Sequence, residues 1–370
     1  MPLILVCAAW GVFWGSWGAL LPAIREQIET GSAGLGPALA VVPLGAIPAM
    51  ALAGRLARGR ERTGLALSSA AFALSILLIA TARSPLALGA CLLLVGATSG
   101  ALDVTLNQAT GRAERDTGKR LFQPVHAAFP VAVIAAAPAT GLARELGLST
   151  FTVLAVIAVI VLAATASLLF LPMPSGPAAP RPDGAANPWR AGFVLGALAA
   201  CVLIIENSVE QWSVLLLEDH RGASALLASI APAAYMGALT LGRLLVQAMP
   251  RLRLRTLYLV SALGGGTGIV LAGLATQPWP AIAGFTLTGL AFGPVVPAIL
   301  SRAAADDPRG ALVSAVSVIS YTGFIVSPLL VAGLSLRVGL PYALALLGLF
   351  ALPLGFRWLA EGISVRKGRT

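Results

Sequence analysis

The stretch Gly54-Arg55-Leu56-Ala57-Arg58-Gly59-Arg60-Glu61-Arg62 carries four arginines between two long apolar blocks. The same pattern returns along the chain, because Lys and Arg collect in every second gap between apolar blocks and in the C-terminal tail. Twenty of the 25 basic residues lie there, and the remaining gaps hold Arg25, Arg83, Arg144, Arg221 and Arg337. Short loops rich in Lys and Arg stay in the cytoplasm. The alternation therefore predicts twelve membrane spans with both termini in the cytoplasm.

The composition agrees with a chain that is surrounded by lipid. Hydrophobic residues make up 58% and charged residues 11% of the 370 residues, whereas soluble domains are about 25% charged. The net charge of +10 does not indicate a nucleic-acid partner, since the basic residues form small clusters without a continuous basic face. We expect the lipid bilayer as the surroundings, and the 23 Arg to 2 Lys suggest a GC-rich bacterial genome. The expected location is thus the bacterial cytoplasmic (inner) membrane.

The apolar blocks are each long enough for one helix, since the bilayer core needs about 20 apolar residues. Backbone in lipid must satisfy its own hydrogen bonds, and the blocks lack the alternation of barrel strands. The fold class is therefore all-α, a polytopic membrane protein of twelve transmembrane helices in two six-helix bundles. The expected spans are 2–24, 34–57, 63–82, 85–110, 121–143, 148–171, 190–217, 222–249, 254–275, 278–302, 310–336 and 339–360.

One long polar break, rich in proline, divides the chain at 172–189. It predicts an N-terminal bundle at 1–171, a cytoplasmic linker at 172–189, and a C-terminal bundle with a short tail at 190–370. Gly54-Arg55-Leu56 matches Gly242-Arg243-Leu244, and Pro138 matches Pro328, at similar offsets. Duplicated halves of this kind are typical of secondary transporters, whose substrate site lies near the midplane of the membrane.

Three acidic residues lie well inside the predicted spans, namely Asp103, Glu206 and Glu210; most of the others, Glu61 among them, fall in loops or at span ends. A charge at the bilayer centre costs about 2.5–3.5 kcal/mol. Asp103 and Asn107 are four residues apart and share a helix face, which Gly96 and Gly100 continue. A carboxyl group there can exchange a proton as water access changes sides. The alternative is a protonated Asp103 that binds a neighbouring helix.

Glu206 and Glu210 also share a face, with Asn207 beside them. One of the two carboxyl groups is expected to take part in proton coupling or substrate binding. Two acidic groups this close do not both ionise in a dry site. The alternative is an interhelical hydrogen bond or a pair that faces water.

Helix 2–24 carries an aromatic stripe that includes Trp14 and Trp17, and a stripe of glycines about 100° away. The glycines allow another helix to approach closely. Trp14 and Trp17 would then stack on a solute, or else fill the core. Gly293-Pro294 with Pro297 should kink the span 278–302, and Tyr321 belongs to a polar stripe in 310–336. Gating, binding and packing remain open for these last residues.

The whole chain resembles the major facilitator superfamily. Leu102-Asp103-Val-Thr-Leu-Asn107, followed by His126-Ala-Ala-Phe129, is similar to a bacterial branch related to fucose-type proton–sugar symporters. Those symporters carry Leu-Glu-x-x-x-Asn, whose carboxylate is the proton-coupling group, so the resemblance places that role on Asp103. Glu206 with Trp212-Ser213 resembles the Glu-x5-Trp-Ser of the same branch.

The chain also departs from these patterns. The loop signature of the superfamily resembles Gly-x-Leu-Ala-Asp-Arg-x-Gly-Arg, and here Arg58 replaces its Asp, so the charge lock assigned to that Asp is in doubt. Drug–proton antiporters have an arginine in helix 4, which the span 85–110 lacks, and their helix 5 element survives only around Pro138.

The sequence predicts a secondary active transporter, coupled to protons, that moves a small organic solute by alternating access. Asp103 would carry the coupling proton, Glu206 would hold a second proton or substrate, and the substrate-binding set would be Trp14, Trp17, Asn107, Asn207, Glu210 and Tyr321. The gating set would be Gly54, Arg55, Arg58, Pro138, Pro294 and Pro297. The alternative within transport is a proton-driven efflux antiporter for drugs or amphipathic compounds.

An enzyme or a sensor are the alternatives outside transport. The chain has two histidines, no HExxH motif and no Cys/His cluster, so neither a hydrolase centre nor a metal site is indicated. We expect no enzyme activity, no cofactor, a monomer, and protons with a small-molecule substrate as partners. His126 would either relay protons or make a structural hydrogen bond.

Overall fold

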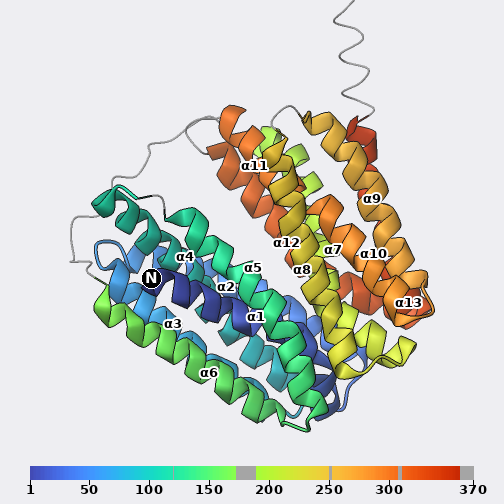
Figure 1. Cartoon of the computed structure of the whole chain (residues 1–370), viewed down its shortest axis with the longest axis horizontal. Coiled ribbons are helices and arrows are strands. Elements are labelled where there is room, and N and C mark those ends of the chain that lie inside the picture. Colours follow the sequence, from blue (N-terminus) through green and yellow to red (C-terminus); the bar gives the residue numbers. More distant parts are fainter. Residues whose placement is uncertain (120, 172–188, 250–251, 307–310, 359–370) are drawn as a thin grey trace, which may run out of the picture. The chain divides into compact units, whose positions relative to one another are not determined.

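The computed structural model describes residues 1–119, 121–171, 189–249, 252–306 and 311–358. Helices make up these residues almost entirely, and no strand occurs among them (Figure 1). Twelve described segments are long and apolar enough to cross a membrane. The all-α prediction and the number of spans are therefore confirmed. The predicted linker 172–189 lies outside the described residues except for Trp189.

The chain divides into two compact units. The first holds residues Met1–Arg181 and also Ser224–Ser229, and the second holds Pro182–Ala223 and Ile230–Thr370. The helices up to 171 are α1 (Pro2–Gln27), α2 (Ser32–Leu56), α3 (Glu61–Leu78), η1 (Ile79–Thr81), α4 (Pro85–Thr117), α5 (Phe122–Glu145), α6 (Thr150–Ser167) and η2 (Leu168–Phe170). Those from 189 onward are α7 (Trp189–Arg221), α8 (Ala225–Ala248), α9 (Leu254–Leu274), α10 (Pro278–Phe292), α11 (Val295–Asp306), α12 (Ala311–Val338), α13 (Leu340–Leu346) and η3 (Leu347–Ala351).

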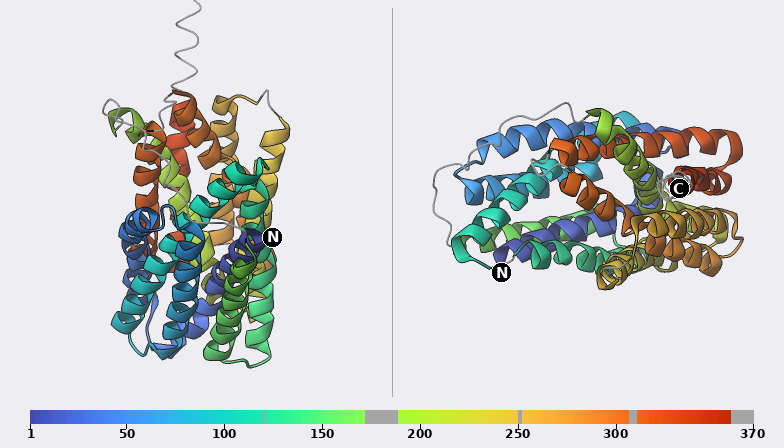
Figure 2. Two further views of the ribbon diagram at one scale, coloured as in Figure 1. Left: turned by 90° about the vertical axis from the view of Figure 1, so that its left-hand side faces the viewer. Right: turned by 90° about the horizontal axis from the view of Figure 1, so that it is seen from above.

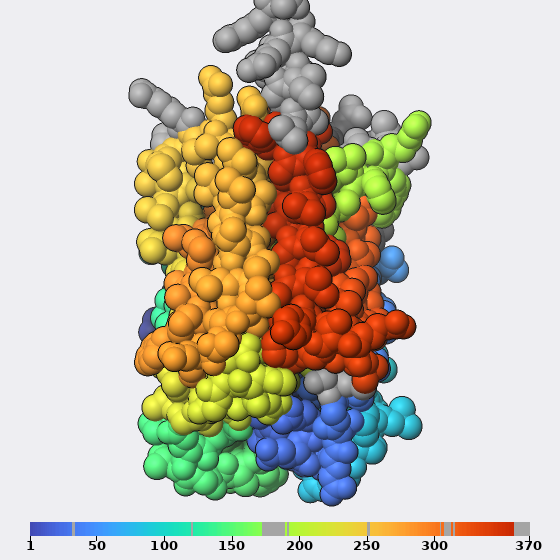
Figure 3. Space-filling model, turned by 90° about the vertical axis from the view of Figure 1, so that its right-hand side faces the viewer, coloured from blue at the N-terminus to red at the C-terminus, as the bar shows by residue number. Residues whose placement is uncertain are grey.

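Each unit is built from helix pairs that pack along their length. In the first unit α1 packs on α5, α2 on α4 and α3 on α6, and the two views of Figure 2 show these helices from the side and from above. In the second unit α7 packs on α12 and α9 on α10. In Figure 3, α9 (orange) and the C-terminal span (red) lie side by side on one face of that unit, and α13 also contacts α9.

Glycines let the paired helices approach closely. In the first unit, a Cβ at Gly96 or Gly100 of α4 would clash with the carbonyl oxygen of Val42 or Ala46 on α2. Gly289 of α10 and Gly293, which directly follows α10, meet the carbonyl oxygens of Tyr235 and Leu239 on α8 in the same way. All four second-unit residues stand 193 positions after their counterparts (42 and 235, 46 and 239, 96 and 289, 100 and 293). The two units therefore repeat one packing register.

This register corrects two details of the sequence analysis. Gly54 and Gly242 are 188 positions apart, so their match lies five residues out of the register in which the helices pack. Gly96 and Gly100 also face α2 rather than extending the face of Asp103, because their missing side chains serve the contact of α2 with α4. The glycine stripe of α1 behaves as predicted, since Gly11 and Gly15 pack on the backbone of Phe129 and Val133 in α5.

Two of the differences from the predicted spans bear on the candidate sites. The helix α4 begins at Pro85, where the Ser84 hydroxyl accepts from the Ala87 N–H at 3.2 Å, and it continues to Thr117. Gly118 ends it with a φ of 68°, a left-handed conformation that glycine adopts at low cost. Arg112 therefore lies on α4 and not in a loop. The span predicted at 278–302 is interrupted at Gly293-Pro294, so that α10 and α11 are separate helices.

Candidate functional site

A polar face on α4 is the first candidate. Ser99, Asp103 and Asn107 are spaced by four residues and therefore lie one above another on the helix. Asn107 Nδ2 donates to Asp103 Oδ1 at 2.9 Å, and His126 Nε2 of α5 lies 2.8 Å from Asn107 Oδ1. Asp103 and Asn107 are half-buried, and His126 is exposed. The structure therefore joins the predicted Asp103 and Asn107 in one hydrogen-bonded chain that ends at His126.

Aromatic residues of α1 reach the same face of α4. The indole N–H groups of Trp10 and Trp14 both point to the Ser99 hydroxyl oxygen, at 2.9 and 3.3 Å. Trp14 is half-buried, so the described residues leave part of its side chain uncovered. Ser99 and Trp10 were not predicted as site residues. Their spacing of four residues from Asp103 and from Trp14, respectively, is the signal that could have indicated them.

Trp17 has a different environment from Trp14. Its side chain is 2% exposed and stacks on Phe13 with 5.9 Å between the ring centroids. The buried Trp17 Nε1 atom has no hydrogen-bond partner among the described residues. This placement corresponds to the core-filling alternative rather than to stacking on a solute.

The acidic face of α7 is the second candidate. Glu206 and Glu210 are half-buried, and Asn207 and Gln211, one residue further along in each case, are each 7% exposed. The side-chain oxygens of Asn207 and Gln211 have no hydrogen-bond partner within the part of the chain that the structure describes. Buried polar atoms are rarely left unpaired in folded proteins. Asn207 and Gln211, which follow the two glutamates on α7, therefore offer hydrogen-bond acceptors that the described protein groups do not use.

Two residues of α8 belong to this second site and were not predicted for it. Tyr235 is fully buried, its hydroxyl has no hydrogen-bond partner in the described ranges, and it interacts electrostatically with Glu206 and Glu210. Arg243 interacts electrostatically with the same two carboxyl groups, while its Nε donates to the Gly293 carbonyl at 2.9 Å. In the sequence, Arg243 was noted for the match of Gly242-Arg243-Leu244 with Gly54-Arg55-Leu56 and not as a site residue. A tyrosine inside the apolar span 222–249 is the signal that could have indicated Tyr235.

Other predicted site residues lie on helices other than α4 and α7. Tyr321 of α12 is half-buried, and its ring centroid lies 5.4 Å from that of Phe324. Pro138 lies inside α5, while Pro294 and Pro297 lie at the break between α10 and α11 and in the first turn of α11. The binding role of Tyr321 and the gating roles of the three prolines stay predictions.

The first residue of α3, directly after the loop from α2, is an acidic residue for which no role was predicted. Arg55 and Arg58 are exposed, and the Gly54 carbonyl accepts a hydrogen bond from Gln108 Nε2 at 2.7 Å. Glu61 is buried at the start of α3, accepts from the Gly59 N–H, and pairs with Arg112 of α4 at 2.8 Å. Glu61 lies at the end of a span, as predicted, but its burial and its ion pair with Arg112 were not predicted. It supplies an acidic group three residues after Arg58.

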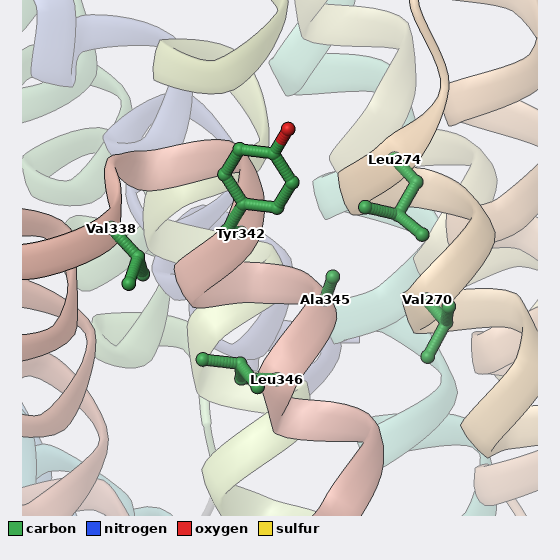
Figure 4. Close-up of a pocket in the computed structure, with 6 residues that line it drawn as sticks. All are labelled: Val270, Leu274, Val338, Tyr342, Ala345 and Leu346. Atoms are coloured by element: carbon green, nitrogen blue, oxygen red, sulfur yellow. The ribbon is translucent and has the colours of Figure 1, made fainter.

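A hollow of about 640 Å³ lies on the second unit, between α9 and the start of the C-terminal span (Figure 4). Its lining consists of Val270, Leu274, Val338, Tyr342, Ala345 and Leu346. Tyr342 is the one lining residue with a polar side chain. A site of this composition offers almost nothing to recognise a polar solute, so we do not assign the functional site to it.

Comparisons with known proteins agree with this architecture. Residues 2–306 match the Major Facilitator Superfamily. An uncharacterized MFS-type transporter of Yersinia pestis is 28% identical over 86% of this chain and 84% of its own length. The membrane protein MosC of Rhizobium meliloti is 24% identical over 90% of this chain and 83% of its own length.

Solved structures share the fold. The nucleoside transporter NupG superposes with a TM-score of 0.76 at 15% identity, covering 97% of this chain and 98% of its own. A bacterial homolog of the human lysosomal transporter Spinster superposes with a TM-score of 0.75 at 14% identity, covering 97% and 95%. The chain belongs to the Major Facilitator Superfamily and is a multi-pass membrane transporter.

Proposed function

We propose that this transporter is proton-coupled and moves a small organic solute across the bacterial cytoplasmic membrane by alternating access. The hydrogen bond between Asn107 Nδ2 and Asp103 Oδ1, inside a membrane-spanning helix, is the observation that carries the proposal. An ionisable group at this depth is costly and calls for a function. Asp103 is half-buried, and the Asn107 amide can donate a hydrogen bond to its carboxylate form. Such a group can bind and release a proton.

The chemistry of the α7 face supports a solute that is rich in hydrogen-bond donors. Asn207 and Gln211 present acceptor oxygens that no described residue uses, and Glu206 and Glu210 add carboxyl groups beside them. A solute with several O–H or N–H groups satisfies such a set, whereas an apolar compound would leave it unpaired. Sugars carry several such hydroxyl donors. Nucleosides carry sugar hydroxyls of this kind, and one protein of this fold transports them.

The solute can be found by a thermal-shift screen of sugars, nucleosides and drugs on the purified protein. A compound that binds the folded state raises the melting temperature with its concentration. The stabilising compound is then loaded into proteoliposomes with a pH gradient. Accumulation driven by an inward proton gradient is expected for symport, and expulsion would establish the efflux antiporter instead.

The coupling role of Asp103 is tested by the Asp103→Asn variant. It should reduce gradient-driven accumulation at least about tenfold while leaving solute exchange without a gradient within about twofold of wild type. Asp116→Asn is the matched control, because Asp116 lies on the same helix with a side chain that is 49% exposed. Full accumulation by Asp103→Asn would contradict the proposal.

A further inference from the structure

His126 occupies one end of the hydrogen-bonded chain that leads to Asp103. It lies in the first two turns of α5, and its ring stacks on that of Phe122 at an interplanar angle of 4° with 6.0 Å between centroids. Its Nε2 atom is 2.8 Å from Asn107 Oδ1. The stacking and the hydrogen bond together hold the imidazole in one orientation.

Asn107, which lies between Asp103 and His126, determines which group donates and which accepts in this row of hydrogen bonds. An amide group has one accepting oxygen and one donating nitrogen. Since Asn107 Nδ2 donates to Asp103, Asn107 Oδ1 must accept, and the group that faces it must donate. His126 therefore needs its proton on Nε2. The opposite orientation of the amide would require an unprotonated Nε2 and would turn Asn107 Oδ1 toward Asp103.

We propose that His126 is a positioning residue for the coupling carboxyl group. By donating from Nε2–H, it fixes the Asn107 amide so that Nδ2–H points to Asp103. Hydrogen bonds in such a row polarise one another and favour a charged acceptor at the end. This inference rests on the proposed function only for the coupling role of Asp103. The direction of the hydrogen bonds from His126 through Asn107 to Asp103 is a property of the protein without solute.

The neighbouring charged groups do not compete for the same atoms. Glu114 of α4 accepts from the backbone N–H of Phe122 at 3.0 Å, and Arg115 Nη1 lies 3.6 Å from the place of a Cβ on Gly111. Cys7 of α1 interacts electrostatically with Asp103. Among the described residues, His126 is thus the ionisable side chain hydrogen-bonded to Asn107 from outside α4.

The tautomer of His126 can be observed directly, because the chain contains two histidines. Protein labelled with ¹⁵N-histidine and carrying His220→Gln retains the signal of His126 alone. At a pH where the imidazole is neutral, we expect its proton on Nε2, and loss of this preference in Asn107→Leu. A proton on Nδ1, or a tautomer that Asn107→Leu leaves unchanged, would overturn the proposal.

A second measurement reads the carboxyl group itself. Infrared spectra of the purified protein over a pH series show the Asp103 carboxyl band, which the Asp103→Asn variant identifies by its loss. His126→Phe keeps the aromatic stacking but removes the donor, and it should move the titration of this band by about 1 pH unit toward higher pH. His126→Gln, which retains a donor, should restore most of the shift, and His220→Gln should cause none.

Neither measurement needs a transported solute. The positioning role of His126 and the coupling role of Asp103 can therefore be tested independently. An unshifted carboxyl titration in His126→Phe would exclude the positioning role while the coupling role of Asp103 stands. If Asp103→Asn retains full accumulation, the coupling role falls even where the tautomer is as expected.

Discussion

Arg112 Nη1 lies 2.8 Å from Glu61 Oε2, and this ion pair joins the start of α3 to the extended end of α4. The two side chains are 13% and 10% exposed. Asp116 adds a weaker contact to Arg112 at 3.6 Å. A pair this far from solvent is costly to break on one side, because the remaining charge stays buried.

This pair predicts strong coupling between its two residues. Glu61→Gln and Arg112→Gln should each destabilise the protein, and the double variant should be less destabilised than the two single effects combined. We expect a coupling free energy of about 1–3 kcal/mol from a double-mutant cycle on unfolding in detergent. The pair Arg302–Asp306 is the control, since its side chains are 59% and 44% exposed. Its coupling should be about 0.5 kcal/mol or less, and equal values for both pairs would contradict the prediction.

The packing register of the two units predicts which glycines tolerate a methyl group. Gly96→Ala and Gly289→Ala would press a Cβ on the carbonyl oxygens of Val42 and Tyr235 and should each lower the free energy of unfolding by about 1–3 kcal/mol. Gly89→Ala is the control in α4, because its Cβ would meet only Ala38 Cα at 3.9 Å.

Gly333 of α12 is the second control, because no described atom lies within 4 Å of an added Cβ. Gly89→Ala and Gly333→Ala should leave the melting temperature of the purified protein unchanged or raise it slightly, because alanine forms helix more readily than glycine. If they destabilise as much as Gly96→Ala, the close approach of the helices is not the cause.

The amide oxygen of Gln211, unpaired among the described residues, predicts a conflict between stability and binding. Gln211→Met keeps the volume but removes a buried polar group without a partner, so the ligand-free protein should gain about 1–3 kcal/mol. The same variant should lose most of the stabilisation that the solute gives to wild type.

Ser208 of α7 is the control for Gln211, because its hydroxyl has partners. It donates to the Ile204 carbonyl at 2.7 Å and lies 2.8 Å from the Ser327 hydroxyl. Ser208→Ala should therefore destabilise by about 1 kcal/mol. Thermal melting of both variants with and without solute distinguishes them, and a less stable Gln211→Met protein would show that the amide has a structural partner.

The shared acceptor of Trp10 and Trp14 predicts a spectroscopic effect. Ser99→Ala removes the oxygen to which both indole N–H groups point. In protein labelled with ¹⁵N-tryptophan, two of the seven indole signals should move, and stability should fall by about 1–2 kcal/mol. Ser84→Ala, which removes the N-cap of the same helix, should leave all indole signals in place. Movement of a single signal would show that only one indole bonds to Ser99.

The sequence alone predicted the spans and the face of α4, because both depend on local order. A run of apolar residues must form a helix in lipid, and residues four apart share its surface. Asp103 and Asn107 therefore lay together before any tertiary contact was known. The glycines of α1 were predictable as a contact for the same reason, although their partner α5 was not.

The tertiary structure decided everything that joins residues far apart in the sequence. His126 meets Asn107 across 19 residues, and Glu61 meets Arg112 across 51. The periodicity of one helix does not determine which residues of a second helix it contacts. Those contacts depend on how the two helices are rotated and shifted along their axes when they pack. The same reason explains the register of 193 residues, which emerged from the contacts of Gly96 and Gly289 and not from matching letters in the sequence.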